Sequence, residues 1–228
     1  MHAPRLALLA STLMLSAALP FGIAVAQTAT AEQLVEIPPN RLQRLYLAPG
    51  ADLTQVTAVI LDPPQVEFRD NWVRDFNAGA RSGRLTDQRA EQIRTEVGAG
   101  LGASFANAFR SGGFDVVEAP GPGVVRVQTH LVNLAVTAPT VQGAGRSRTF
   151  ASTAGEATLV VEVRDSRTNA LLARALDGRI AGQSRLALRN SVTNRSDFRR
   201  VAEIWARSSV DDVRALQAAT VGEASTQP

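Results

Sequence analysis

Cysteine and lysine are both absent from this chain of 228 residues, and histidine occurs only twice. Without cysteine no disulfide can form, and no thiolate can act as a nucleophile or as a metal ligand. The same absence excludes the lipid-modified N-terminal cysteine by which bacteria commonly tether exported proteins. Disulfide scaffolds, thiol enzymes and lipoproteins of that kind are therefore excluded.

Histidine chemistry is limited in the same way. His2 falls in the leader segment described below, so His130 is the only histidine left for a folded domain. A lone histidine without HxH or HExxH spacing is a poor metal site. A triad built on His130 would need a serine in a GxSxG elbow, which the sequence lacks. We predict a solvent-facing strand histidine, and no catalytic, cofactor-binding or metal-ligating residue.

The basic residues are all arginines. These 24 arginines are interspersed with 21 acidic residues, which leaves a net charge of +3 and is typical of an ordinary solvated surface. The order helix, three strands, helix also occurs in double-stranded RNA-binding domains, but those use lysine-rich helix ends to contact phosphates. A lysine-free chain with an export signal is not expected to bind nucleic acid.

The N-terminal segment has the composition of a secretory signal peptide covering residues 1–26. Arg5 precedes an apolar run over Leu6–Val25, and Ala24 and Ala26 are the small residues that a signal peptidase reads. Cleavage is expected after Ala26. A retained anchor helix is the alternative, because the run approaches the ~20 residues that span a bilayer. A proline and a glycine near the end of the run favour cleavage.

Between this leader and the C-terminus we expect one domain. Residues 27–44 are polar and contain Pro38 and Pro39, which is typical of an extended tether. Residues 45–218 supply the periodic apolar segments of a single α+β domain, and residues 219–228 form a polar tail that we expect to fray. No transmembrane segment is expected after processing, and the sequence leaves the oligomeric state open.

The stretch from Gly123 to Pro139 is the strongest strand signal in the chain. Apolar or β-branched residues alternate with polar ones up to Leu131, and from Val132 onward the apolar residues occupy the opposite parity. One extra residue in a strand produces such a change. We predict a long central strand with a β-bulge near Leu131–Val132.

The remaining periodic segments place this strand in a sheet. An apolar run over Val56–Leu61 predicts a buried strand, and Thr86 caps an amphipathic helix. Residues 157–163 and 170–180 alternate as the two strands of a hairpin, and a last helix begins near Asn194. We therefore predict an α+β domain with the order β-α-β-β-β-β-α. Its single, mostly antiparallel sheet has about four to five strands, with two helices packed on one face.

The first predicted helix contains Gly98, Gly100 and Gly102. Each glycine disfavours a helix by about 1 kcal/mol relative to alanine, so their presence indicates a close approach of the helix to the sheet. A phosphate-binding loop is excluded, because these glycines lie within the helix and no Gly-Lys-Ser/Thr follows.

The segment after the first strand concentrates the candidate functional residues. Its carboxylates are Asp62, Glu67, Asp70 and Asp75. Two carboxylates near one substrate can act as acid and base, which keeps a hydrolase or lyase open. Arginines in the same polar loop, Arg69–Arg84, favour surface ion pairs instead.

The aromatic residues of this loop, Trp72 and Phe76, are candidate partner contacts. Trp72 is either a lid over the edge of the sheet or an exposed anchor for a partner. Trp205 falls on the apolar stripe of the last helix and is predicted to lie in the core.

Several of these features occur together in one known layout. They are the Asp-Pro end of the strand Val59–Pro63, the tryptophan loop, the helix capped by Thr86, the strand RVQTHLVNL and the hairpin at Val160–Asn169. The layout resembles the bacterial family catalogued as domain of unknown function 3313, envelope lipoproteins, over roughly Leu45 to Leu216. The resemblance implies an envelope location and brings no activity or site residues. The chain departs from that family in lacking the lipidation cysteine.

Three functional hypotheses remain open. The first is a non-enzymatic periplasmic or secreted protein that binds an envelope protein or an outer-membrane component. The second is a hydrolase or lyase that uses the carboxylates of Asp62–Asp75. The third is a small-ligand carrier, which requires an apolar cavity between the sheet and the helices.

The leader generates the first testable prediction. Protein recovered from the periplasm of an expressing bacterium should begin at Gln27, because the small residues Ala24 and Ala26 direct cleavage there. N-terminal sequencing or intact mass would show this. Replacing both alanines by leucine should leave the precursor uncleaved in the membrane fraction, whereas an unprocessed wild-type chain would contradict the prediction.

Overall fold

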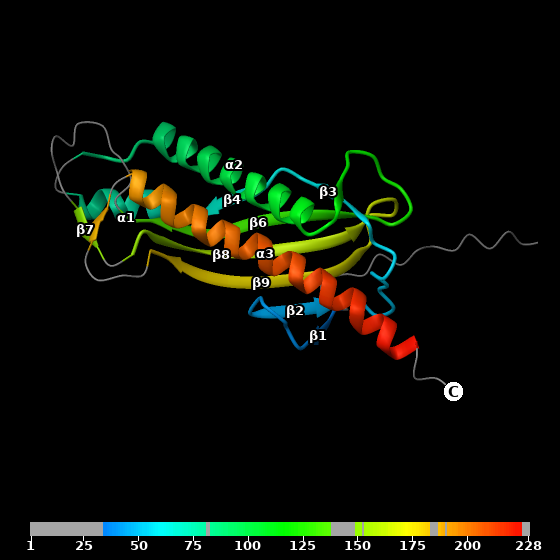
Figure 1. The fold of residues 1–228 in the computed structure, drawn as a ribbon. Helices are drawn as coiled ribbons and strands as arrows, with labels where there is room; N and C mark the ends of the chain where they lie inside the picture. The colour runs from blue at the N-terminus through cyan, green and yellow to red at the C-terminus, as the bar shows by residue number, and fades with distance from the viewer. Residues whose placement is uncertain are drawn as a thin grey trace, which may run out of the picture.

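A computed structural model describes residues 34–80, 83–137, 149–151, 153–182, 187–189 and 191–224. The expected leader, with Ala24 and Ala26, lies outside the described residues, as do the last four residues of the tail. The described residues form an α+β fold with one main sheet and three helices (Figure 1).

The core is built around strand β6 (Val124–Val136), the strongest strand signal of the sequence. Its first buried side chains alternate from Val125 to Leu131, and beyond the change of parity Leu134, Ala135 and Val136 are buried. The register against β8 shifts between Val132 and Ala135. The bulge therefore lies just beyond the predicted position, and Asn133 adopts a φ of 55° within it.

Strand β6 belongs to a mixed sheet with the order β1-β2-β9-β8-β6-β3-β5, in which β4 also pairs with β6. Its strands are β1 (Val35–Ile37), β2 (Arg44–Leu47), β3 (Ala58–Leu61), β4 (Gln65–Phe68), β5 (Asp115–Val116), β6, β8 (Gly155–Asp165) and β9 (Leu171–Ala181). A separate antiparallel pair is formed by β7 (Thr149–Ala151) and β10 (Ala187–Arg189).

This sheet corrects the predicted architecture. The prediction of a mostly antiparallel sheet of four to five strands with two helices is wrong, since the described residues form a sheet of eight strands and three helices. Strands β3 and β4 run parallel to β6, and β5 runs parallel to β3, because a helical crossover lies between the members of each pair. The strands that the prediction omits, β1, β2 and β4, have only three or four residues, too few to show a period. The α+β class itself is correct.

The helices are α1 (Trp72–Gly79), α2 (Asp87–Ser111) and α3 (Ser191–Ala224). Helix α1 occupies the segment predicted to be a polar loop. That prediction is wrong, because α1 is a short helix of eight residues whose N-cap residue, Asn71, is left-handed and makes no side-chain cap hydrogen bond. Helix α2 begins at Thr86, whose hydroxyl accepts from the backbone N–H of Arg89, as a capping residue should.

Helices α2 and α3 lie side by side over one face of the main sheet and run in the same direction (Figure 1). At their C-terminal parts they are in close contact. A Cβ atom built on Gly112 would come within 2.6 Å of Val210 Cγ1, and Arg214 donates to the carbonyl of Gly112 at 2.6 Å. A glycine is needed there because no side chain fits between the helices.

The predicted approach of the glycine-rich part of α2 to the sheet is confirmed. A Cβ atom on Gly98 would lie 3.5 Å from Val66, and one on Gly102 would lie 3.3 Å from Pro64. Gly100 does not lie against the sheet, because a Cβ atom built there would meet nothing within 4 Å. Two of the three glycines therefore allow the helix to pack closely on β4 and on the turn before it. The third borders open space.

A buried carboxylate on the last helix accepts hydrogen bonds from the N-terminal part of the fold. Asp212 on α3 accepts from the backbone N–H groups of Arg41 at 2.9 Å and Leu42 at 3.3 Å. Burial raises the pKa of Asp212 above its ordinary value, which these hydrogen bonds partly oppose. Leu42 is buried and β1 is paired with β2, so the fold includes residues from the segment expected to be a tether.

No helix within the described ranges is both long enough and apolar enough to cross a bilayer.

Two glycines of the hairpin give a stability prediction. Gly155 has a φ of 151°, and an added Cβ would lie 2.8 Å from Phe198, so Gly155→Ala should cost about 2 kcal/mol or more. Gly178→Ala is the matched control. Its Cβ would make only ordinary contacts at 3.6 and 3.7 Å, and its effect should stay within about 0.5 kcal/mol. Urea unfolding measures both, and equal losses would contradict the prediction.

Candidate functional site

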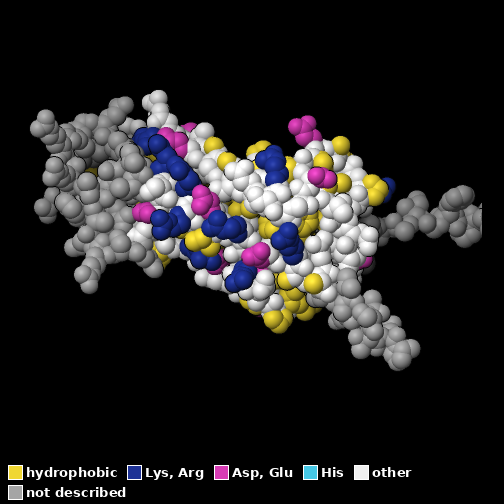
Figure 2. Space-filling model, in the orientation of Figure 1, with side chains coloured by type: hydrophobic (Ala, Val, Ile, Leu, Met, Phe, Trp, Pro, Cys, Tyr) yellow, Lys and Arg dark blue, Asp and Glu magenta, His cyan; other side chains and the backbone are white. Residues whose placement is uncertain are grey.

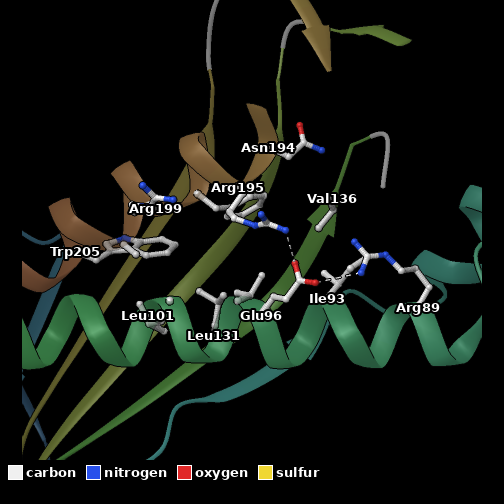
Figure 3. Close-up of a pocket in the computed structure, with 14 residues that line it drawn as sticks. Arg89, Ile93, Glu96, Leu101, Leu131, Val136, Asn194, Arg195, Arg199 and Trp205 are labelled. Carbon is white, nitrogen blue, oxygen red and sulfur yellow. Dashed lines mark hydrogen bonds and ion pairs between the residues drawn. The ribbon is translucent and has the colours of Figure 1, made fainter. Parts of the chain in front are cut away.

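The main candidate site is a cavity of about 220 Å³ enclosed by α2, α3 and β6. It lies beside the first halves of both helices, whereas their second halves are in contact. Its apolar wall is formed by Ile93, Leu101, Leu131, Val136, Phe198 and Trp205. These side chains come from three elements and converge on one space (Figure 3).

Most of the wall residues belong to the ordinary buried faces of their elements. Ile93 and Leu101 belong to the apolar stripe of α2, and Trp205 belongs to that of α3. Leu131 and Val136 lie on either side of the β6 bulge, which turns both toward the helices. Because of the bulge, a single strand contributes wall residues from both odd-numbered and even-numbered positions.

The indole of Trp205 is held in place by a buried hydrogen bond. Its Nε1 donates to Asp177 Oδ2 at 3.1 Å, and Arg179 Nε donates to the same oxygen at 2.7 Å. Trp205 and Asp177 are 1% and 2% exposed. The predicted core position of Trp205 is confirmed, and the ring forms a fixed end of the cavity wall.

The mouth of the cavity is charged. Arg89 from α2 and Arg195 from α3 each contact Glu96 at 3.2 Å, from opposite sides (Figure 3). Burial acts to raise the pKa of Glu96, but hydrogen bonds from Arg89 and Arg195 outweigh it and hold the pKa below its ordinary value. Glu96 therefore stays ionised and links the two helices across the mouth.

Further arginines line the outer surface next to this mouth. Arg199 borders both the cavity and a second, open hollow between the helices, which also contacts Arg207 and Arg214. Figure 2 shows the basic and acidic side chains interspersed over this face, with apolar atoms between them. The described residues provide Arg199 with no ion-pair partner.

The four sequence-predicted carboxylates do not all meet at one site, and only Glu67 and Asp70 border the same hollow. Asp62 forms an ion pair with Arg126 and accepts from Gln128 Nε2 at 2.9 Å on the sheet face away from the helices. Asp75 pairs with its neighbour Arg74. Glu67 and Asp70 are exposed and border a shallow surface hollow together with Asp87 of α2. His130 is half-buried on β6 between Gln65 and Val160.

The candidate partner contacts differ in exposure. Trp72 is 4% exposed and its ring stacks on Phe68 with a centroid separation of 4.5 Å. The ring of Trp72 is therefore buried in this structure. Phe76 is half-buried against the same core.

Within the described ranges no three histidine or acidic side chains form a group suited to a metal ion. The cavity has no motif in the sequence. Its only sequence signal is Gly100, a helix-interior glycine that no close approach to β4 requires.

A polar network crosses the uncovered sheet face and starts from Asp62. Gln128 accepts from Arg164 at 3.1 Å, and Glu162 pairs with both Arg164 and Arg174. Burial acts to raise the pKa of Glu162, but the hydrogen bonds of the two arginines lower it below its ordinary value. Glu162 is therefore charged at neutral pH although it is buried.

This network generates a pH-dependent stability prediction. The folded-state pKa of Glu162 is lowered, so its stabilisation is complete above the unfolded pKa and is lost as the pH falls through the folded pKa. Glu162→Gln should cost about 1–3 kcal/mol at pH 7, and the cost should shrink below pH ~4.

Glu156→Gln on the same strand is the control for this prediction. Glu156 pairs with Arg69, and both side chains are about half exposed, so its removal should cost less than about 1 kcal/mol. Urea unfolding at both pH values measures each cost. A Glu162→Gln cost that stays constant with pH would contradict the assignment.

Comparison with solved structures gives distant likenesses. A PelC dodecamer from Paraburkholderia phytofirmans is 15% identical, with 75% of this chain and 94% of that chain covered and a TM-score of 0.36. Protein XCC0632 from Xanthomonas campestris is 12% identical, with 83% and 95% covered and a TM-score of 0.40. At TM-scores this low, neither likeness supports an inference about function or assembly.

Family membership rests on the sequence. No curated protein matches the chain. A family model described as "Protein of unknown function (DUF3313)" matches residues 29–209, which confirms the resemblance predicted above. The chain therefore belongs to the DUF3313 family.

Proposed function

We propose that this protein is an exported, non-enzymatic envelope protein that binds an apolar molecule in the cavity between α2, α3 and β6. The observation that carries the proposal is the cavity itself. Protein interiors are close-packed, and apolar spaces of this size are few in a domain. A space of about 220 Å³ with an apolar wall and a charged mouth has the arrangement of a ligand site.

The location follows from the leader. The apolar run over Leu6–Val25, with small residues at Ala24 and Ala26, supports export to the periplasm or beyond. The molecule that binds would then be a component of the envelope. Among the three hypotheses from the sequence, the small-ligand carrier is the one that requires such a cavity.

The other candidate residues support binding at the cavity rather than elsewhere. Trp72 offers little surface to a partner, because its ring is stacked on Phe68. Asp62 is already paired with Arg126, so it is a weak candidate for acid–base work. The apolar side chains of the cavity wall instead border a space that a ligand can fill.

Gly100 allows a direct test. It lines the cavity, and a Cβ atom there meets nothing within 4 Å, so Gly100→Leu adds carbon into open space. Leucine is a better helix former than glycine by roughly 1 kcal/mol, so the helix should be retained. Gly100→Ala is the control, with the same gain in helix propensity and little added volume.

The measurement is titration of each protein with the neutral fluorescent probe naphthalene, whose two fused rings are somewhat larger than benzene and match the size of the cavity. Wild type and Gly100→Ala should bind the probe with similar affinity, and Gly100→Leu should bind about tenfold more weakly or worse. Circular dichroism should show equal helix content in all three. Equal binding by Gly100→Leu, or no binding by wild type, would overturn the proposal.

A further inference from the structure

The mouth of the cavity carries more positive than negative charge. Arg89, Arg195 and Arg199 border it, and Glu96 is the acidic residue among its lining side chains. Glu96 is shared by Arg89 and Arg195. Arg199, which the described part of the chain leaves without an ion pair, is a free guanidinium beside an apolar opening. A guanidinium binds a carboxylate through two parallel hydrogen bonds.

The size of the cavity limits what can enter it. An apolar cavity of about 150 Å³ in another protein holds one benzene molecule, so about 220 Å³ accommodates a somewhat larger group. This is below the roughly 300–1,000 Å³ of sites for drug-sized ligands. The space suits one medium-length hydrocarbon chain and is too small for the two chains of a phospholipid.

We propose that the ligand is a single-chain amphiphile with a carboxylate head, such as a medium-chain fatty acid. This inference rests on the proposed function and names the class of ligand for the same site. The chain occupies the wall of Ile93, Leu101 and Trp205, and the head lies at the mouth against Arg199 and Arg195. Apolar burial provides the affinity, and the arginines select for the charged head.

Glu96 has a defined part in this site. Glu96 forms an ion pair with Arg195 at 3.2 Å in the unliganded protein. A carboxylate head must therefore compete with Glu96 for Arg195. Its own charge also repels an anionic head. Removal of the Glu96 charge should therefore strengthen the binding of a carboxylate relative to the binding of a neutral amphiphile by the same variant.

The test compares decanoate with decanol as competitors of bound naphthalene at pH 8, where decanoate is charged. Wild type should prefer decanoate by about tenfold or more. Arg199→Gln should lose this preference and Glu96→Gln should increase it, each measured as the ratio of decanoate to decanol affinity within one variant, so that a general change in binding cancels. High salt should weaken decanoate binding only.

Arg200→Gln is the matched control, because Arg200 is exposed on the same helix and does not line the cavity. It should behave as wild type. Equal affinities for decanoate and decanol, or equal effects of Arg199→Gln and Arg200→Gln, would overturn the carboxylate head while leaving probe binding intact. Loss of probe binding by wild type would instead overturn the proposed function, so the two failures are distinguishable.

Discussion

The contact between α2 and α3 at Gly112 determines the arrangement of the helical layer. Val210 occupies the space that a side chain at position 112 would need, so the helices meet in their C-terminal parts. In its middle, α2 instead packs on β4 and the turn before it through Gly98 and Gly102. One helix cannot follow both the sheet and its neighbour closely along its whole length. The cavity lies beside the part of α2 that packs against the sheet.

Much of the fold was predictable because its long elements repeat one pattern many times. Strand β6 has 13 residues and α2 has 25, so alternation in one and the apolar stripe in the other are clear. The parallel pairing of β3 with β6 was not predictable in this way. A period shows which face of a strand is buried, but it does not show which neighbour the strand pairs with.

The cavity could not be predicted from the sequence for a related reason. Val136 and Phe198 border the same space although they lie far apart in the chain, and neither differs from an ordinary core residue. A cavity depends on the volume that side chains leave unfilled, which no residue type signals. The carboxylates were conspicuous in the sequence because they are close together along the chain. In the fold, Asp62 and Asp75 have separate arginine partners.

The hydrogen bonds of Asp212 have a consequence for the order of assembly. Strand β2 joins the main sheet through β9, and the backbone of Arg41 and Leu42 is held by α3, about 170 residues later in the chain. A chain that emerges N-terminus first must therefore keep β1 and β2 unpaired with the sheet until β9 is present, and the backbone of Arg41 and Leu42 is held only once α3 has followed. The N-terminal strands are synthesised first, but their contacts with the rest of the domain form late. The domain is complete only after its C-terminal helix has been synthesised.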